Sequence, residues 1–157
     1  MSIKIVKNQN GIGLVETILA LGIAIVVITA LVSLAVYTLR SSQQSKYLLE
    51  GSKLASEQVE LVRLGKDASA TWLDFYNLMN TCSSKDCTAD GTGAINDNPA
   101  PTDKQITLSN GANVDRFFRA TIIDNNTVRI TSTVQWKVGP SVKKTTVVTD
   151  ITNWRNR

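Results

Sequence analysis

Histidine is absent from the 157-residue chain, cysteine occurs only twice and proline only three times. The lack of histidine removes the commonest general base and the commonest metal ligand. The "GTG" at 91–93 is not followed by the Lys-Ser/Thr pair of a phosphate-binding loop. No nucleophile is spaced to meet a base. We therefore expect no catalytic residues, no cofactor and no enzymatic activity.

The two cysteines, Cys82 and Cys87, stand in "CSSKDC". A zinc site needs about four ligands, which two cysteines without histidine do not supply in a usual combination. The loop 81–103 around them lacks the acidic ligands and the closing glutamate of an EF-hand, so we expect no metal. A disulfide is expected if this region lies outside the cytoplasm, and two free thiols if it lies inside.

Charge is missing from residues 17–39, which are nearly all apolar. As a helix this segment is about 35 Å long, enough to cross a hydrocarbon core of about 30 Å. Three interpretations compete. A cleaved secretory peptide has a shorter apolar core and an A-x-A-like exit, which is not evident here. A signal anchor fits the length and the flanks but leaves Glu16 unexplained. Lysines or arginines lie on both sides, so charge does not settle the orientation.

Glu16 is a carboxylate at the start of this apolar segment. Taken to the bilayer centre, such a charge costs about 2.5–3.5 kcal/mol. One explanation is local: an acid in the first helical turn is favoured by the helix dipole. The other is a cationic partner, which cutting the chain after Gly11 would create. The new α-amine of Ile12 could meet Glu16 of another subunit and neutralise both charges. The third interpretation of the segment builds on this second explanation.

The stretch "KNQNGIGLVETILALGIAIVVITAL" resembles the N-terminus of type IV prepilins and type II secretion pseudopilins. The resemblance implies cleavage between Gly11 and Ile12 by a prepilin peptidase, N-methylation of Ile12, and Glu16 as the charge partner in filament assembly. It implies a pilin-like α+β fold, with a long N-terminal transmembrane and spine helix packed on a small antiparallel β-sheet. The chain departs from the family in having Ile12 instead of the usual Phe, and Ser33 where many members carry a proline.

The resemblance also implies a domain layout and a location. Residues 1–11 are the leader, 12–39 the transmembrane half of the helix and 40–157 an extracytoplasmic head. The expected partners are the prepilin peptidase, other pilin subunits, the assembly platform and the cytoplasmic membrane. The chain would cross that membrane once, head outside, and then enter a surface filament. A minor pilin is favoured; the alternatives are a pseudopilin of a type II secretion or DNA-uptake machine, or an uncleaved membrane-anchored binding domain.

Hydrophobic periodicity divides the head into three parts. A helix is expected to continue over 40–64 and to stop at Gly65, with one apolar stripe at Tyr47, Leu48, Leu54, Ala55, Val59 and Val62. Residues 65–103 form a variable helix and loop region. Within it, 69–80 reads as a short helix with four inward-facing side chains, Trp72, Phe75, Tyr76 and Met79. Residues 81–103 are rich in Gly, Asn, Asp and Pro and are expected to be loop.

Residues 104–157 alternate between apolar and polar side chains and predict three or four antiparallel strands. Turns are expected at 124–127 and 139–140. One face of the strongest strand should carry Val128, Ile130, Val134, Trp136 and Val138. One face of the preceding strand should carry Phe118, Ala120 and Ile122. DNA binding is possible through the basic residues of this region, but a solvated face is favoured; these residues are Arg116, Arg119, Arg129, Lys137, Lys143 and Lys144.

Overall fold

The structure is a computed structural model that describes residues 10–108 and 111–154, with side chains from residue 13 onward. The chain divides into two compact units, Met1–Ser45 and Lys46–Arg157. Helix α1, Asn10–Ala68, contributes to both units. The rest of the second unit is a second helix and two antiparallel sheets. One long, apolar N-terminal helix with a small antiparallel sheet is an α+β layout, as predicted.

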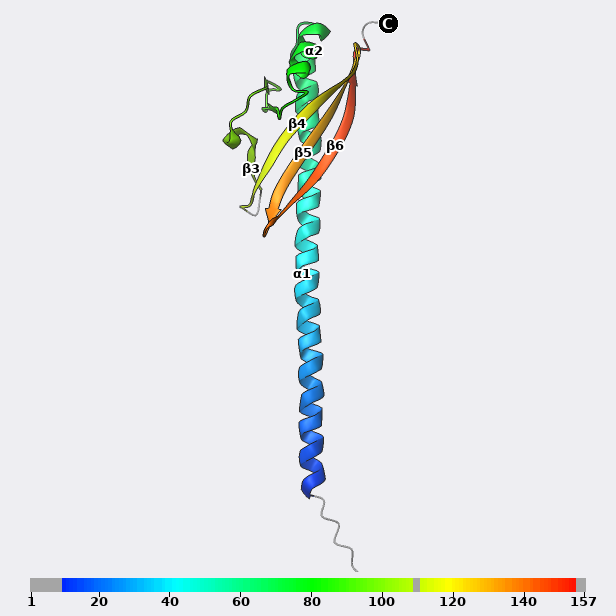
Figure 1. The fold of residues 1–157 in the computed structure, drawn as a ribbon, viewed down its shortest axis with the longest axis vertical. Helices are drawn as coiled ribbons and strands as arrows, with labels where there is room; N and C mark the ends of the chain where they lie inside the picture. The colour runs from blue at the N-terminus through cyan, green and yellow to red at the C-terminus, as the bar shows by residue number, and fades with distance from the viewer. Residues whose placement is uncertain (1–9, 109–110, 155–157) are drawn as a thin grey trace, which may run out of the picture. The chain divides into compact units, whose positions relative to one another are not determined.

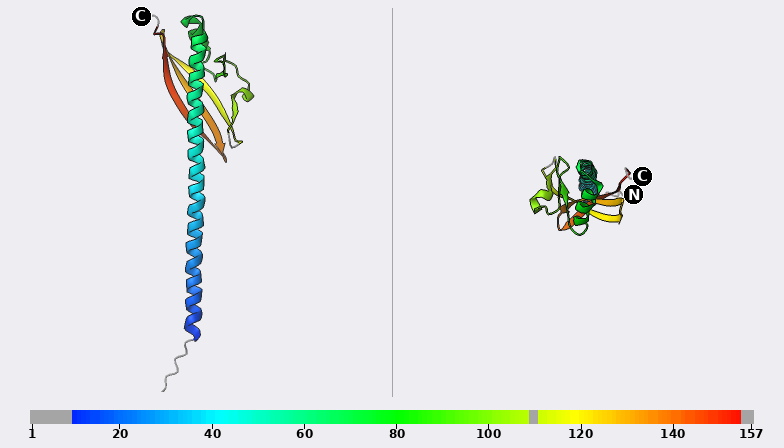
Figure 2. Two further views of the ribbon diagram at one scale, coloured as in Figure 1. Left: turned by 180° about the vertical axis from the view of Figure 1, so that it is seen from behind. Right: turned by 90° about the horizontal axis from the view of Figure 1, so that it is seen from above.

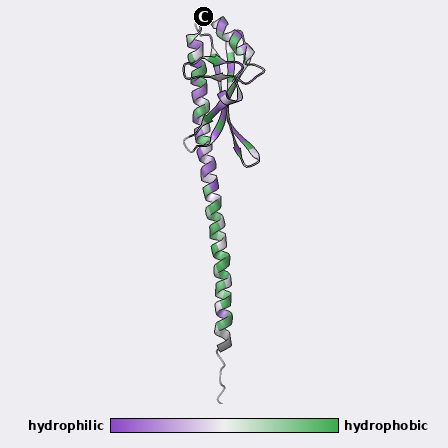
Figure 3. Ribbon diagram, turned by 90° about the vertical axis from the view of Figure 1, so that its left-hand side faces the viewer, coloured by the Kyte–Doolittle hydropathy of each residue, from purple (hydrophilic) through white to green (hydrophobic). Residues whose placement is uncertain are grey.

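The first unit is helical throughout its described part. The apolar segment of this unit contains no proline, so every residue in it keeps a backbone N–H for the hydrogen bonds of the helix. The hydroxyl of Thr29 donates to the carbonyl of Ile25 at 2.8 Å, and the hydroxyl of Ser33 donates to that of Thr29 at 2.9 Å. These polar side chains in an apolar helix are thus satisfied by the preceding turn. The concentration of apolar residues in this part of α1 is visible in Figure 3.

The predicted stop at Gly65 is wrong, because α1 continues to Ala68. Gly65 has no left-handed backbone conformation. Glycine is instead required at position 65 because another segment lies close to the helix backbone there. A Cβ on Gly65 would lie 2.5 Å from the carbonyl oxygen of Gly93. The helix ends where the Ser69 hydroxyl turns back and donates to the carbonyl of Gly65 at 2.8 Å.

The predicted second helix is present as α2, Trp72–Thr81. Thr71 and Asp74 form a capping box at its N-terminus, which fixes the start of the helix. Phe75 and Met79 are fully buried, whereas Trp72 and Tyr76 are only partly buried. The loop predicted at 81–103 contains more order than expected, namely strands β1 (Thr88–Ala89) and β2 (Ile95–Asn96) and the short helix η1 (Pro101–Lys104).

Four strands form the main sheet in the order β3-β4-β5-β6, all antiparallel. Their bounds are Gln105–Thr107, Asn113–Asp124, Thr127–Val138 and Ser141–Thr152. Figure 1 shows them side by side in chain order. Both predicted turns are confirmed, and Gly139 in the second has a φ of +59°, a conformation that favours glycine.

The sheet packs on the C-terminal part of α1, within the second unit (Figure 2). The rings of Tyr47 and Trp136 stack with their centroids 6.1 Å apart. The predicted inward faces of β4 and β5 are confirmed, with one exception. Val138 is 48% exposed, because it lies at the end of the β5–β6 hairpin, beyond the helix contact.

Candidate functional site: the exposed apolar helix and the head surface

The described part of the first unit presents an uncovered apolar surface. Every described residue from Gly13 to Ser45 is exposed. The large apolar side chains on this surface are Leu14, Val15, Ile18, Leu19, Leu21, Ile23, Ile25, Val26, Val27, Ile28, Leu31, Val32, Leu34, Val36, Tyr37 and Leu39. By length and composition α1 could cross a membrane. A surface this large and apolar requires lipid or another apolar partner.

Glu16 is an exposed carboxylate on this surface. It forms no ion pair with any residue that the structure describes. Because α1 begins at Asn10, Glu16 is the seventh residue of the helix and the first turn contains no acid. The dipole effect falls off within the first turn. In the uncut chain Glu16 therefore lies beyond the turn in which the helix dipole favours an acid.

The predicted cleavage site lies at the beginning of the same helix. Gly11 and Ile12 belong to the first turn of α1, although their side chains lie outside the described part. Residues 1–9 of the predicted leader are also outside the described residues. The structure places Glu16 four to five residues after these two positions on one continuous helix.

The predicted disulfide joins Cys82 and Cys87, whose Cα atoms are 5.8 Å apart. Both cysteines are fully buried in the larger core cluster. The Cys87 amide donates to the Phe118 carbonyl at 2.9 Å, and the Phe118 amide donates to the Cys87 carbonyl at 2.8 Å. The Ala120 amide donates to the Cys82 carbonyl at 3.1 Å. The cross-linked loop therefore covers a stretch of β4 that β3 does not reach, which protects an otherwise open strand edge.

The six basic residues considered for DNA binding fall into two groups. Each of the three arginines pairs with an acid: Arg116 with Glu57 at 3.2 Å, Arg119 with Asp86 at 2.8 Å, and Arg129 with Asp150 at 2.8 Å. The first two pairs could not be predicted from the sequence, because their partners come from distant segments. These arginines are largely neutralised, so they do not form one continuous basic face with the three lysines.

Two of these acids have altered acidities. Burial alone would raise the pKa of Asp86, but hydrogen bonds from Lys104 and Arg119, and the charges of both, lower its pKa overall. The hydrogen bonds that Asp150 accepts from Arg129 lower the pKa of Asp150, and they raise the pKa of the arginine. The surface of the sheet is thus held by ion pairs in their charged form.

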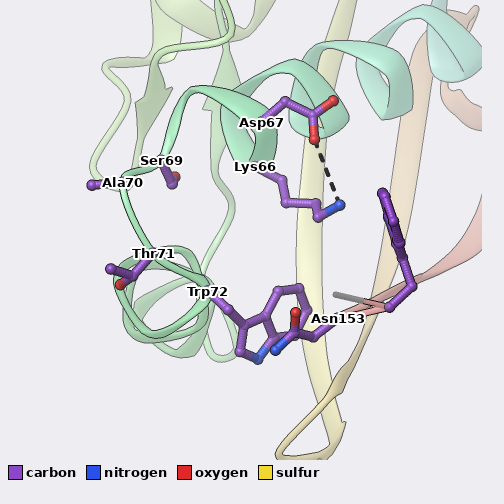
Figure 4. A pocket seen from close by; sticks show the side chains of 8 residues that line it. Lys66, Asp67, Ser69, Ala70, Thr71, Trp72 and Asn153 are labelled. Carbon is purple, nitrogen blue, oxygen red and sulfur yellow. Dashed lines mark ion pairs between the residues drawn. The ribbon is translucent and has the colours of Figure 1, made fainter. Parts of the chain in front are cut away.

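A shallow cavity of about 330 Å³ lies near the C-terminal end of α1, lined by Lys66, Asp67, Ser69, Ala70, Thr71, Trp72, Asn153 and Trp154 (Figure 4). The Lys66 ammonium lies 6.0 Å from the centroid of the Trp154 ring and 3.5 Å from the Asp67 carboxylate. The Trp72 indole donates to the Asn125 carbonyl at 2.8 Å. The polar groups of this cavity mainly bind one another and the backbone, and none of them forms a nucleophile–base pair.

The acidic loop considered for calcium is folded on itself. The Asp90 carboxylate accepts hydrogen bonds from the amides of Thr92 and Ala94 at 2.8 Å and 3.0 Å. The hydrogen bond from the Thr92 hydroxyl, together with these bonds from the backbone, lowers the pKa of Asp90. Among residues 10–108 and 111–154, no group of three or more potential metal ligands comes together. Asp90 closes a turn that brings Gly93 against α1.

No protein-family model, curated protein or solved structure matches the chain. The family resemblance therefore depends on the N-terminal residues alone.

Proposed function

We propose that the chain is a structural subunit of a type IV pilus-like filament, most simply a minor pilin. In this proposal a prepilin peptidase cuts between Gly11 and Ile12. The mature chain is held in the cytoplasmic membrane by the apolar part of α1, with the second unit outside. It then enters a filament through helix–helix packing. Pseudopilins of secretion or DNA-uptake machines use the same chemistry and remain the nearest alternatives.

The observation that carries the proposal is Glu16, an acid without an ion-pair partner in the described chain, on an exposed apolar helix. In an apolar environment such a charge is stable only when it is paired. Cutting after Gly11 supplies an amine on Ile12, four residues away, on the same surface. A staggered neighbouring helix can bring that amine to Glu16 of another subunit, which neutralises both charges. The disulfide is also consistent with a head outside the cytoplasm.

Co-expression with a prepilin peptidase tests the cleavage step. Mass spectrometry should find a chain that begins at Ile12, with or without a methyl group. Gly11→Ala should leave the full-length chain. A wild-type chain that still begins at Met1 beside an active peptidase would refute the proposal and favour an uncleaved membrane-anchored binding domain.

A second experiment tests the charge pair. Glu16→Ala should be cleaved normally but should be largely lost from sheared filaments of the native host. Glu60→Ala is the matched control, because Glu60 lies on the same helix and, among the residues that the structure describes, pairs only with the exposed Arg63 at 2.6 Å. Such a surface pair contributes little to stability. Equal incorporation of the Glu16 variant and the control would show that Glu16 does not act in assembly.

A further inference from the structure

We propose that the end of the β5–β6 hairpin binds anionic phospholipid headgroups of the bilayer that the apolar part of α1 spans. We define the hairpin tip as residues 137–144. This inference depends on the membrane span of the proposed function, but not on cleavage or filament assembly. Its partner is a lipid surface of negative charge, bound by lysine ammonium groups and flanking valine side chains.

The first observation is unpaired positive charge. Lys137, Lys143 and Lys144 are exposed, and they form no ion pair within the described part of the chain. The arginines of the same sheet all have acidic partners, so the tip differs from the rest of the sheet. The acid nearest in register is Asp115, which accepts a hydrogen bond from Gln135 at 3.2 Å, while Gln135 pairs with Lys144 across β5 and β6. The tip therefore carries a local excess of positive charge.

The second observation is exposed aliphatic side chains beside these charges, on both faces of the hairpin. Val138 is 48% exposed and Val142 is 57% exposed. Val142 lies opposite Lys137 in the strand register. Lysines beside exposed aliphatic side chains are typical of surfaces that bind at the bilayer interface, because the ammonium groups meet lipid phosphates while the apolar groups enter the headgroup region.

The third observation is the short tether to the membrane. Leu39 ends the apolar run and Tyr47 follows eight residues later. Even a fully extended chain of that length spans at most about 28 Å, whatever the arrangement of the two units. Tyr47 stacks on Trp136, and Trp136 lies opposite Lys143 in the register. The chain itself therefore limits how far the hairpin tip can move from the bilayer surface.

The tether also favours a lipid surface over the other possible partners, DNA and a second copy of the chain. DNA must be brought from solution and a second copy must meet this one by diffusion in the membrane, whereas the lipid surface is held at a high effective concentration by the chain's own span. Three lysines also form a small patch for a nucleic acid, whose binding grows with the number of phosphates neutralised. A lysine near an anionic membrane shifts the docked population about fivefold, so three lysines should shift it on the order of 100-fold.

Fluorescence quenching in vesicles tests the contact. The full-length chain carries Ser141→Cys, a tip position outside the proposed lysine and valine contacts, labelled with a fluorophore under non-reducing conditions so that the Cys82–Cys87 disulfide does not react. It is reconstituted into phosphatidylcholine vesicles, with or without 30 mol% phosphatidylglycerol, that contain a quencher at headgroup depth. We expect strong quenching only in the anionic vesicles. It should fall in 1 M salt, where the Debye length is about 3 Å.

The variant Lys137→Gln/Lys143→Gln/Lys144→Gln should lose this quenching. The matched control, Arg63→Gln/Lys66→Gln/Lys85→Gln, removes the same charge from elsewhere in the second unit and should keep it. Quenching that is equal in neutral and anionic vesicles overturns the proposal. So does quenching that changes with the amount of protein per vesicle, because that dependence indicates contact with a second copy of the chain. Carbonate extraction of the same vesicles reports insertion. A chain that does not insert overturns the membrane span as well, whereas an inserted chain without charge-dependent quenching overturns only the lipid contact.

Discussion

Two explanations of why residue 65 is glycine predict opposite changes in the free energy of unfolding when it is replaced by alanine. Gly65 lies inside α1 with no left-handed backbone conformation. If only helix propensity mattered, Gly65→Ala would stabilise the protein by about 0.8–1 kcal/mol. The structure predicts the reverse, because the space for a Cβ is already occupied by the backbone of another segment.

The steric cost follows from the distances. A Cβ on Gly65 would lie 2.5 Å from the Gly93 carbonyl oxygen and 3.0 Å from Cδ1 of Ile95. The carbonyl cannot move easily, because Gly93 has a φ of +83° and its amide donates to the Asp90 carbonyl at 3.0 Å. Overpacking costs about 1–3 kcal/mol. Because backbone must move here, we expect the upper part of that range, about 2–3 kcal/mol, from which the propensity gain of about 0.8–1 kcal/mol is subtracted. We expect a net loss of about 1–2 kcal/mol in the free energy of unfolding.

Denaturant unfolding of the full-length chain in detergent, followed by tryptophan fluorescence, measures this change. All three tryptophans lie in the second unit, so the signal reports its unfolding. Gly91→Ala is the control, because Gly91 is in the same loop but has no atom within 4 Å of a built Cβ. It should change the free energy by less than about 0.5 kcal/mol. A Gly65→Ala chain as stable as the wild type would refute the close-approach explanation.

Two further predictions concern the loop next to β4. Cys82→Ala/Cys87→Ala, which buries no unpaired hydroxyl, should lower the free energy of unfolding by at least about 2 kcal/mol, the contribution of cross-linking so short a loop; an unchanged unfolding midpoint would contradict this role of the disulfide. Burial raises the pKa of Asp86, but Lys104 and Arg119 more than offset it, so its folded pKa lies below the unfolded value. Its contribution is therefore complete above about pH 4 and is lost as pH falls through the lower, folded pKa. Asp86→Asn should flatten the loss of stability below pH 4, and an unchanged acid slope would refute this.

The periodic elements of the fold could be predicted because they depend on local patterns. The alternation of apolar and polar side chains over residues 127–138 predicted β5. The turn residues predicted where both hairpins reverse direction. The end of α1 could not be predicted, because it depends on which segment packs against Gly65. The role of Arg116 could not be predicted either, because its partner Glu57 is 59 residues away in the sequence. Contacts between distant segments thus account for most of the differences between the predicted and the observed structure.

Two buried polar residues show how strongly position outweighs residue type in this core. Gln58 and Ser132 are fully buried, and their side-chain polar atoms have no hydrogen-bond partner among the described residues. Gln58 follows Ala55 by three positions and so lies on the buried face of α1, and Ser132 continues the inward alternation of β5. Leaving such groups unpaired costs about 1–3 kcal/mol each.

These two residues also explain why the apolar core has two parts. One cluster contains Ala55, Val134 and Trp136, from the start of the helix contact and the end of β5. The other contains Val62 and Ile130 together with α2 and the disulfide. Gln58 lies between Ala55 and Val62 on α1, and Ser132 lies between Ile130 and Val134 on β5. The helix and the strand therefore each place a polar residue at the boundary, and the two clusters remain separate because polar side chains from both elements interrupt the apolar contact there.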